Sequence, residues 1–295
     1  MAFPLLIRDI TIPGVRSDGY RDAACVPGLT GPVVSQGEFP EDVRHGLMHQ
    51  FQDFLEENRI VSVYSRLHFL MGQEDLLSGY GELREEGMEV TVDLTVPPEE
   101  HLARYRRGHR SDLKSLWNME LTFEEVGPEY LDEFVRLYYP TMNRVGASER
   151  YYVEKSYFEY LLTEMRDFTR LFVAKHNDTV VAAELDQVCN GHIRGYLYGD
   201  MEEYRRLGVS KLMYHSVIVW GHSTGFRVFH LGGGSPSLCN CKMGFNGRKH
   251  VYSTWRHIAD SAVYEDLCRQ VYVLSGRKPN DAYFPEYRSP SLGLG

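Results

Sequence analysis

The sequence predicts an α/β (α+β) protein of two related domains, residues 1–118 and 119–295, with mixed sheets flanked by helices. Three observations support this prediction. Residues 40–117 show an order of helix, strand, loop, strand and helix, and a similar order returns roughly 165 residues later. Residues 169–198 read as three strands joined by tight turns. The repeated order indicates a duplicated fold, and the reaction centre is expected between its two halves.

The elements of the first domain follow from hydrophobic periodicity. Two short strands, residues 5–12 and 22–26, are expected first. Residues 40–58 carry apolar side chains at helical spacing, and residues 60–70 change to the alternation of a strand. Residues 88–94 alternate too, and Pro97 and Pro98 begin a helix to about Trp117, because a first helical turn needs no proline N–H. Since its first strands are short, this domain is expected to be reduced.

The second domain shows both periodicities. Its antiparallel meander is joined at Asn177-Asp178 and Asn190-Gly191, which are turn-forming pairs. Gly225 is expected to end the long helix that follows the meander. The expected strands are residues 121–126, 169–175, 179–188, 192–198, 226–231 and 251–258, and the expected helices are 129–144, 155–167, 211–224 and 261–275.

Composition restricts the classes of function. The chain has a formal net charge of −9, so a polyanion would bind only where basic residues are segregated. Arg106, Arg107 and Arg110 form such a candidate in a predicted helix, with a solvated helix face as the alternative. No apolar run approaches the roughly 18 residues of a membrane helix, and no secretory signal is visible. The five scattered cysteines are expected as free thiols, which favours a cytoplasmic protein.

A meander followed by a loop, a helix and a strand is the element order of the GNAT acyltransferase fold. The sequence also resembles the Fem family, GNAT-like transferases that move amino acids from aminoacyl-tRNA to peptidoglycan precursors. The resemblance spans nearly the whole chain and depends on these segments: residues 4–8, 61–62, 66–68, 92–94, 105–110, 231–234, 242–245 and 283–288, with Tyr138, Thr141, Arg144 and Tyr152.

The resemblance implies two tandem GNAT-like domains and an amide-forming aminoacyltransferase. The donor would be aminoacyl-tRNA, with Arg106, Arg107 and Arg110 as the tRNA-binding residues and no further cofactor. The acceptor would be a nucleotide-sugar peptide, another peptide or a small molecule. Lys242 matches the functional lysine of the family, and Arg144 matches an arginine associated with the diphosphate of the acceptor.

The chemistry of the residues agrees with these roles. Aminolysis of an activated ester requires alignment of a neutral amine and stabilisation of the developing oxyanion. Lys242 is the leading candidate for the positive group beside the ester, with an ordinary surface lysine as the alternative. Gly232, Gly233 and Gly234 end an apolar strand and would let a backbone approach a ligand closely, or would form a flexible turn.

The other candidates have alternatives of comparable weight. The Arg144 fork could bind a diphosphate or make a structural salt bridge. Arg66 and His68 could line the same site, although a buried strand histidine is more often a core residue. Tyr152, Tyr198 and Tyr214 could stack on a base or sugar, but core packing is the default for each of the 20 tyrosines.

Other classes of function compete. A metal site is not expected, because Cys239 and Cys241 lack a matching second pair of ligands. An acyl-CoA N-acyltransferase is the first alternative, although residues 205–208 hold only a fragment of the usual pyrophosphate loop. A noncatalytic nucleotide-sugar or peptide binding module is the second alternative, since Cys239 and Cys241 replace the aromatic residues that relatives carry near Lys242. The oligomeric state is left open.

Overall fold

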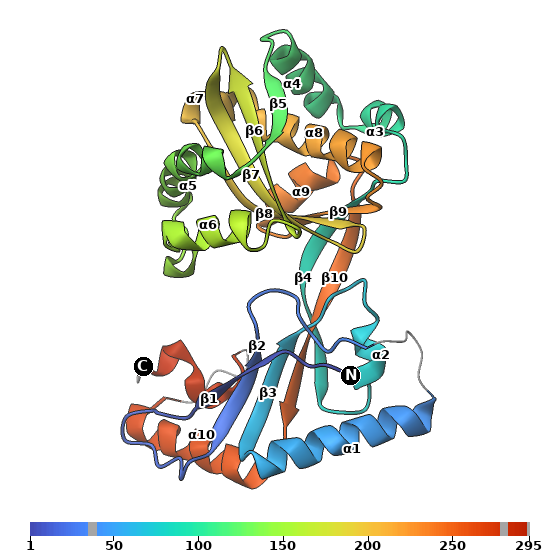
Figure 1. Cartoon of the computed structure of the whole chain (residues 1–295). Helices are drawn as coiled ribbons and strands as arrows, with labels where there is room; N and C mark the ends of the chain where they lie inside the picture. The colour runs from blue at the N-terminus through green and yellow to red at the C-terminus, as the bar shows by residue number, and fades with distance from the viewer. Residues whose placement is uncertain (35–39, 278–282, 294–295) are drawn as a thin grey trace. The chain divides into compact units, whose positions relative to one another are not determined.

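The computed structural model describes residues 1–34, 40–277 and 283–293 (Figure 1). The chain divides into two compact units. Unit 1 comprises Met1–Gly87 and Val251–Gly295, and unit 2 comprises Met88–His250. The chain passes between them within strands β4 (Glu82–Asp93) and β10 (Arg248–Ile258). This division differs from the predicted domains, because residues 88–118 belong to unit 2 and residues 251–295 to unit 1.

Unit 1 is a mixed sheet between two helices. The strand order in this sheet is β1 (Leu5–Asp9), β2 (Arg21–Cys25), β3 (Ile60–Arg66) and β10. Among these strands, β2 and β3 pair in parallel and the other neighbours are antiparallel. Helix α1 (Glu41–Glu57) packs on the face that carries Ile60 and Val63, and α10 (Ser261–Ser275) packs on the face that carries Val61. The described part of the unit also contains the short helical segments α2 (Gln73–Leu77), Glu286–Arg288 and Pro290–Leu292.

Unit 2 contains a sheet in the order β4-β9-β8-β7-β6-β5. Its strands beyond β4 are β5 (Thr122–Val126), β6 (Thr169–His176), β7 (Thr179–Cys189), β8 (His192–Asp200) and β9 (Val228–Gly232). Only β8 and β9 pair in parallel, and the other neighbours are antiparallel. The predicted meander is therefore confirmed, and Asn177, Asp178, Asn190 and Gly191 all adopt the positive φ of such turns.

Helices cover both faces of the unit 2 sheet (Figure 1). Helices α4 and α8 pack on the face that carries Phe172, and α5 and α6 pack on the face that carries Leu171. The helices are α3 (Pro98–Arg104), α4 (Arg107–Trp117), α5 (Leu131–Val145), α6 (Lys155–Thr163), α7 (Glu202–Leu207), α8 (Val209–Ser223) and α9 (Pro236–Met243), with 3-10 turns at Pro128–Tyr130 and Glu149–Tyr151. The predicted class, mixed sheets flanked by helices, is confirmed.

Two predicted elements differ from the structure. The single helix expected over residues 97–117 is broken between α3 and α4, because Tyr105 and Arg106 adopt extended backbone angles. Tyr105 is buried and packs edge-on against Phe245, so the break places an aromatic ring in the core. Helix α9 directly follows the glycine run, for which the sequence analysis offered a ligand-binding backbone or a flexible turn. The five cysteines are free thiols, and no helix in the described ranges is long and apolar enough to cross a bilayer.

Candidate active site

Lys242 is buried at the end of α9. The helix begins directly after the glycine run that ends β9, where Ser235 caps it by accepting a hydrogen bond from the Leu238 N–H at 3.3 Å. Lys242 is only 5% exposed, and its Nζ donates to the Gly233 carbonyl oxygen at 2.7 Å. Burial lowers the pKa of Lys242, although nearby acids oppose the shift. The alternative of an ordinary surface lysine is therefore wrong.

The glycine run is closely packed against β4. Gly232 has a φ of +79°, which favours glycine. A Cβ on Gly233 would lie 2.6 Å from the Met88 carbonyl oxygen. Side chains at these positions would therefore displace either β4 or the backbone that holds Lys242.

Two acids that the sequence analysis did not select lie near Lys242. Glu184 and Asp186 are two residues apart on β7, so both point to the same face of the sheet. They are 2% and 0% exposed. Across the described part of the chain, Glu184 Oε2 and both Asp186 carboxyl oxygens find no hydrogen-bond partner. We call Glu184 and Asp186 the acid pair.

The acid pair resists ionisation. Burial raises the pKa of Glu184 to about 8, while the positive charge of Lys242 opposes the increase. Burial raises the pKa of Asp186 well above its usual range, and the charge of Glu184 adds to the effect. Such strongly shifted groups cluster at functional sites, although structural networks also produce them.

The acid pair lies where β8 stops pairing with β9. Residues His192–Arg194 pair with Val228–His230, and no further pairs follow in β8. On the other side, β8 stays paired with β7, with Tyr198 opposite Glu184 and Gly195 opposite Asp186. A Cβ on Gly195 would lie 3.4 Å from Glu184 Oε1. We call the end of the β8 and β9 pairing, at Arg194 and His230, the strand fork.

Other polar side chains surround this point. His230 Nε2 lies 2.8 Å from Glu89 Oε2, and both residues are largely buried. Burial raises the pKa of the Tyr214 phenol, and the charge of Glu184 adds to it. Tyr198 donates to Asp200 Oδ2 at 3.1 Å. Predicted residues on β8, α8 and α9 thus gather around the acid pair.

Two predicted substrate residues have local partners. Arg144 forms an ion pair with Asp200 and also donates to Thr141 Oγ1 at 3.3 Å. This is the structural salt bridge that was the alternative to diphosphate binding, so a ligand phosphate would have to share the guanidinium with Asp200. Tyr152 is exposed, and its hydroxyl donates to Asn143 Oδ1 at 2.9 Å.

Arg66 and His68 belong to unit 1. The Arg66 guanidinium donates to the Tyr252 hydroxyl at 2.5 Å and lies 5.0 Å from the Tyr252 ring centre. His68 follows β3, and its Nδ1 accepts from the Leu70 N–H at 3.2 Å. These contacts all lie within unit 1, and their roles in binding substrate stay predictions.

The three predicted tRNA-binding arginines are exposed near α9. Arg106 donates to Asn240 Oδ1 at 3.0 Å, two residues before Lys242 in the chain. His109 Nε2 lies 2.8 Å from the Cys241 carbonyl oxygen. Arg110 donates to the Ala103 and Tyr105 carbonyl oxygens. We call Arg106–Arg110 the basic segment, and its contacts with Asn240 and Cys241 connect it through α9 to Lys242.

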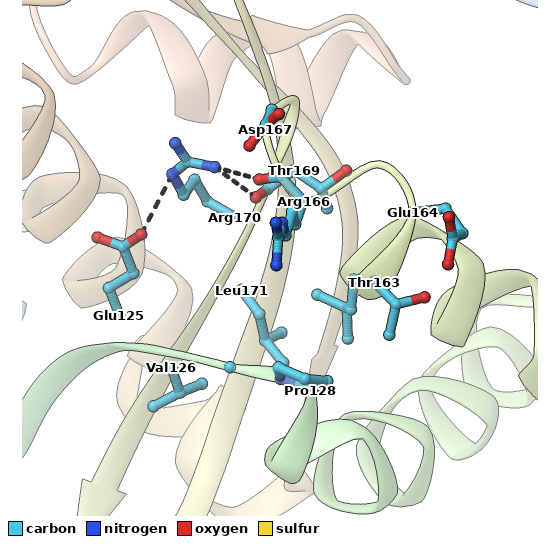
Figure 2. Close-up of a pocket in the computed structure, with 12 residues that line it drawn as sticks. Glu125, Val126, Pro128, Thr163, Glu164, Arg166, Asp167, Thr169, Arg170 and Leu171 are labelled. Carbon is cyan, nitrogen blue, oxygen red and sulfur yellow. Dashed lines mark hydrogen bonds and ion pairs between the residues drawn. The ribbon is translucent and has the colours of Figure 1, made fainter.

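A pocket of about 660 Å³ lies elsewhere in unit 2, between the ends of β5, β6 and α6 (Figure 2). An ion pair between Arg170 and Glu125, at 3.2 Å, lies at one side of it. None of the predicted site residues lines this pocket. Its walls carry both acids and arginines, including Arg166 and Asp167, so its charge favours no single class of ligand.

Comparisons with known proteins agree with this architecture. Residues 101–237 match the family described as "Acetyltransferase (GNAT) domain". A crystal structure of FemX has 12% identity and a TM-score of 0.67, covering 87% of this chain and 85% of that chain. The structure of L-PGS from Bacillus licheniformis has 16% identity and a TM-score of 0.56, with 89% and 88% covered. Comparison with curated proteins finds no significant match.

These findings confirm a Fem-like GNAT fold, as the sequence predicts, and the match to an acetyltransferase domain is over residues 101–237. The acid pair was missed, although one signal for it was present. Two acids alternate with apolar residues in an otherwise apolar strand, so period-two spacing already placed them on one face.

Proposed function

We propose that the chain is an aminoacyltransferase that moves an amino acid from aminoacyl-tRNA to an amine and forms an amide bond. The observation that carries this proposal is the buried Lys242 beside the acid pair, within the matched GNAT fold. Proteins of similar fold include FemX and the C-terminal domain of a putative lysylphosphatidylglycerol synthetase from Agrobacterium fabrum. The second has 15% identity and a TM-score of 0.55, covering 93% of this chain and 87% of that chain, and its name implies an aminoacyl product.

Lys242 would act on the ester. Its ammonium, held by the Gly233 carbonyl, can polarise the ester carbonyl or hold the terminal phosphate of the donor. A positive group in a site that excludes water stabilises a developing oxyanion more strongly than one in water. The attacking amine must be neutral, and the C–N bond forms as the bond from the carbonyl carbon to the tRNA hydroxyl oxygen breaks. The leaving oxygen takes up one proton from the attacking nitrogen.

The basic segment supports a polyanionic donor. Arg106, Arg107 and Arg110 are exposed in a chain of net charge −9, and Arg106 contacts the helix that carries Lys242. Arginines segregated in this way can attract phosphates despite the overall charge.

The residues expected of an acyl-CoA enzyme are engaged otherwise. Arg206 forms an ion pair with Glu202 at 2.7 Å, and Gly208 ends α7 with a φ of +87°. Gly208 also directly precedes α8, so this segment is a short junction between two helices. We propose a peptidoglycan precursor, another peptide or a small amine as the acceptor, at a cytoplasmic site of synthesis.

The donor can be identified directly. The purified protein is incubated with tRNA charged by radiolabelled amino acids, or with acyl-CoA, and with a panel of nucleotide-sugar peptides and small amines. We expect label in an alkali-stable amide, and we expect ribonuclease treatment of the donor to abolish the transfer. Thiol release from acyl-CoA would support the acyl-CoA alternative. Silence with both donors, in a protein that still binds an acceptor, would support the binding module.

A further inference from the structure

The acid pair has more hydrogen-bonding capacity than the protein uses. Glu184 Oε2 and both Asp186 carboxyl oxygens make no hydrogen bond of normal geometry in the described ranges, although the Tyr196 N–H and the Glu184 carboxyl lie near enough to Asp186 to shift its pKa. Both acids are at least 98% buried. Leaving a buried acceptor unpaired is energetically unfavourable, so such groups usually have a ligand or a function.

The acid pair has two carboxyl groups but only one positive group among the causes of its pKa shifts. Lys242, from α9, is the positive group that acts on Glu184, and it is shared with Glu89. No positive group is among the causes that shift Asp186. The other titratable groups facing the pair are the phenols of Tyr198 on β8 and Tyr214 on α8. One further positive charge would therefore balance two ionised carboxylates.

We propose that Glu184 and Asp186 bind the primary ammonium group of a substrate at the strand fork. A primary ammonium carries one positive charge and three N–H donors, which matches the charge and the acceptor oxygens that have no hydrogen bond of normal geometry. Pairing of β8 with β9 ends at Arg194, and Gly195 has no side chain between this point and Glu184 Oε1.

Two substrates of the proposed reaction carry this group. One is the amino acid on the donor ester, through its α-ammonium, and the other is the acceptor amine before it loses its proton. The identity of the bound substrate rests on the proposed function, but ammonium binding can be measured without any transfer reaction.

Binding should be coupled to proton release. The acid pair retains a proton at neutral pH because burial raises both pKa values, and an incoming cation favours the ionised form. Up to one proton should leave the pair for each ammonium bound.

The experiment is calorimetric titration at pH 7 in two buffers with different ionisation enthalpies. The donor arm uses amino-acid amides with small, acidic and basic side chains, and the acceptor arm uses aliphatic diamines that lack a carbonyl. N-acetylated amides and sodium chloride are the probes without an ammonium. The variants are Glu184→Gln, Asp186→Asn and the double variant, with Asp167→Asn, an exposed acid of unit 2, as the matched control.

At least one arm should bind to the wild-type protein and the Asp167→Asn control with proton release. The dissociation constant should rise more than tenfold in the double variant, where proton release should disappear. The arm that binds identifies the source of the ammonium. The proposal would be overturned by any of three results. The wild type and the double variant could bind with equal affinity, N-acetylated amides could bind as well as free amines, or neither arm could show binding. Ammonium binding without transfer from tRNA would reject the proposed reaction and retain this site.

Thermal unfolding separates a binding defect from misfolding. The amide variants preserve size and remove buried charge, so we expect their melting temperatures to equal or exceed that of the wild type. If the double variant fails to fold, the single Asp186→Asn variant carries the test, and it must weaken ammonium binding for the proposal to hold.

Discussion

Burial and nearby charges act on the ionisation of Lys242 in opposite directions, and burial is the larger effect. Burial favours its neutral form, whereas Glu89 and Glu184 favour the ammonium. The Gly233 carbonyl accepts one of its protons and orients it. Its charge therefore depends on the acid pair, and the ionisation of Glu184 depends on Lys242 in return.

Replacement of Lys242 by Met should remove the charge and preserve the packing volume. We expect kcat/KM for aminoacyl transfer to fall more than tenfold, because the positive field at the ester is lost. Steady-state kinetics and circular dichroism measure activity and fold. Lys114→Met, at an exposed position of α4, is the control and should retain activity. Wild-type turnover in Lys242→Met would remove Lys242 from the mechanism.

The raised pKa of Glu184 should appear in the pH dependence of stability. Its folded-state pKa of about 8 lies above the ordinary value of 4.5, so the folded protein holds this proton more tightly than the unfolded chain. The stabilisation is complete below pH 4.5 and is lost as the pH rises through about 8, by up to ~1.4 kcal/mol per pH unit for one proton.

Urea unfolding between pH 5 and pH 8.5 measures this effect. Relative to Glu184→Gln, the wild-type protein should lose free energy of unfolding as the pH rises. Parallel curves for the two proteins would mean that Glu184 titrates normally in the folded protein.

At the scale of residues, the side chains with reactive groups were easier to predict than the contacts that surround them. Lys242 and the glycine run could be selected from the sequence, and they do lie in contact. Glu184 and Asp186 were missed because acids in a strand usually face solvent, and only the helices over this face of the sheet bury them. The partner of Arg144 could not be predicted, since Asp200 is far away in the sequence.

At the scale of elements, α9 and the basic segment behave as one structure. Arg106 donates to Asn240, and its backbone N–H donates to the Gly244 carbonyl oxygen at 2.9 Å. His109 contacts the carbonyl of Cys241, the residue before Lys242. A tRNA that binds the exposed arginines would therefore bind beside the helix that carries Lys242.

Charge reversal tests this role. The triple variant Arg106→Glu, Arg107→Glu and Arg110→Glu should weaken tRNA binding, and the slope of log affinity against log salt should fall by roughly 0.7 to 0.9 for each lost phosphate contact. Filter binding between 50 and 200 mM salt is a suitable measurement. Arg269→Glu, an exposed arginine of α10 in unit 1, is the control. An unchanged slope in the triple variant would show that the segment is only a solvated face.

Elements with strong local signals were predicted well. The meander depends on turn residues that accept positive φ, and these are visible in the sequence. The break at Tyr105 is not visible, because it depends on the contact of Tyr105 with Phe245. Helix α9 could have been found, since Ser235 and Pro236 form a cap and a first helical turn.

At the scale of the molecule, unit 1 combines an N-terminal and a C-terminal part of the chain. The paired residues of β3 and β10 are separated in the sequence by the whole of unit 2. A prediction from local sequence patterns therefore assigns β10 to the second domain. The predicted boundary at residue 118 follows from this locality. The position of the reaction centre between two domains stays a prediction.

Asp22 connects the two ends of the chain within unit 1. It is fully buried and forms ion pairs with Arg8 and Arg288, and the Tyr287 hydroxyl donates to it at 3.2 Å. Asp22→Asn removes the negative charge and leaves two arginines without their shared partner. Removing one member of such a buried group costs about 3 kcal/mol or more, so unit 1 should unfold more readily.

Hydrogen exchange can locate this loss. In Asp22→Asn, peptides from residues 1–25 and 283–293 should exchange faster, whereas peptides from residues 169–200 should keep their protection, because unit 2 has cores of its own. Asp18→Asn, which affects only an exposed ion pair with Arg16, should change neither set. Equal loss of protection in both units would show that they unfold as one cooperative structure, and the compact units would then not be independent in stability.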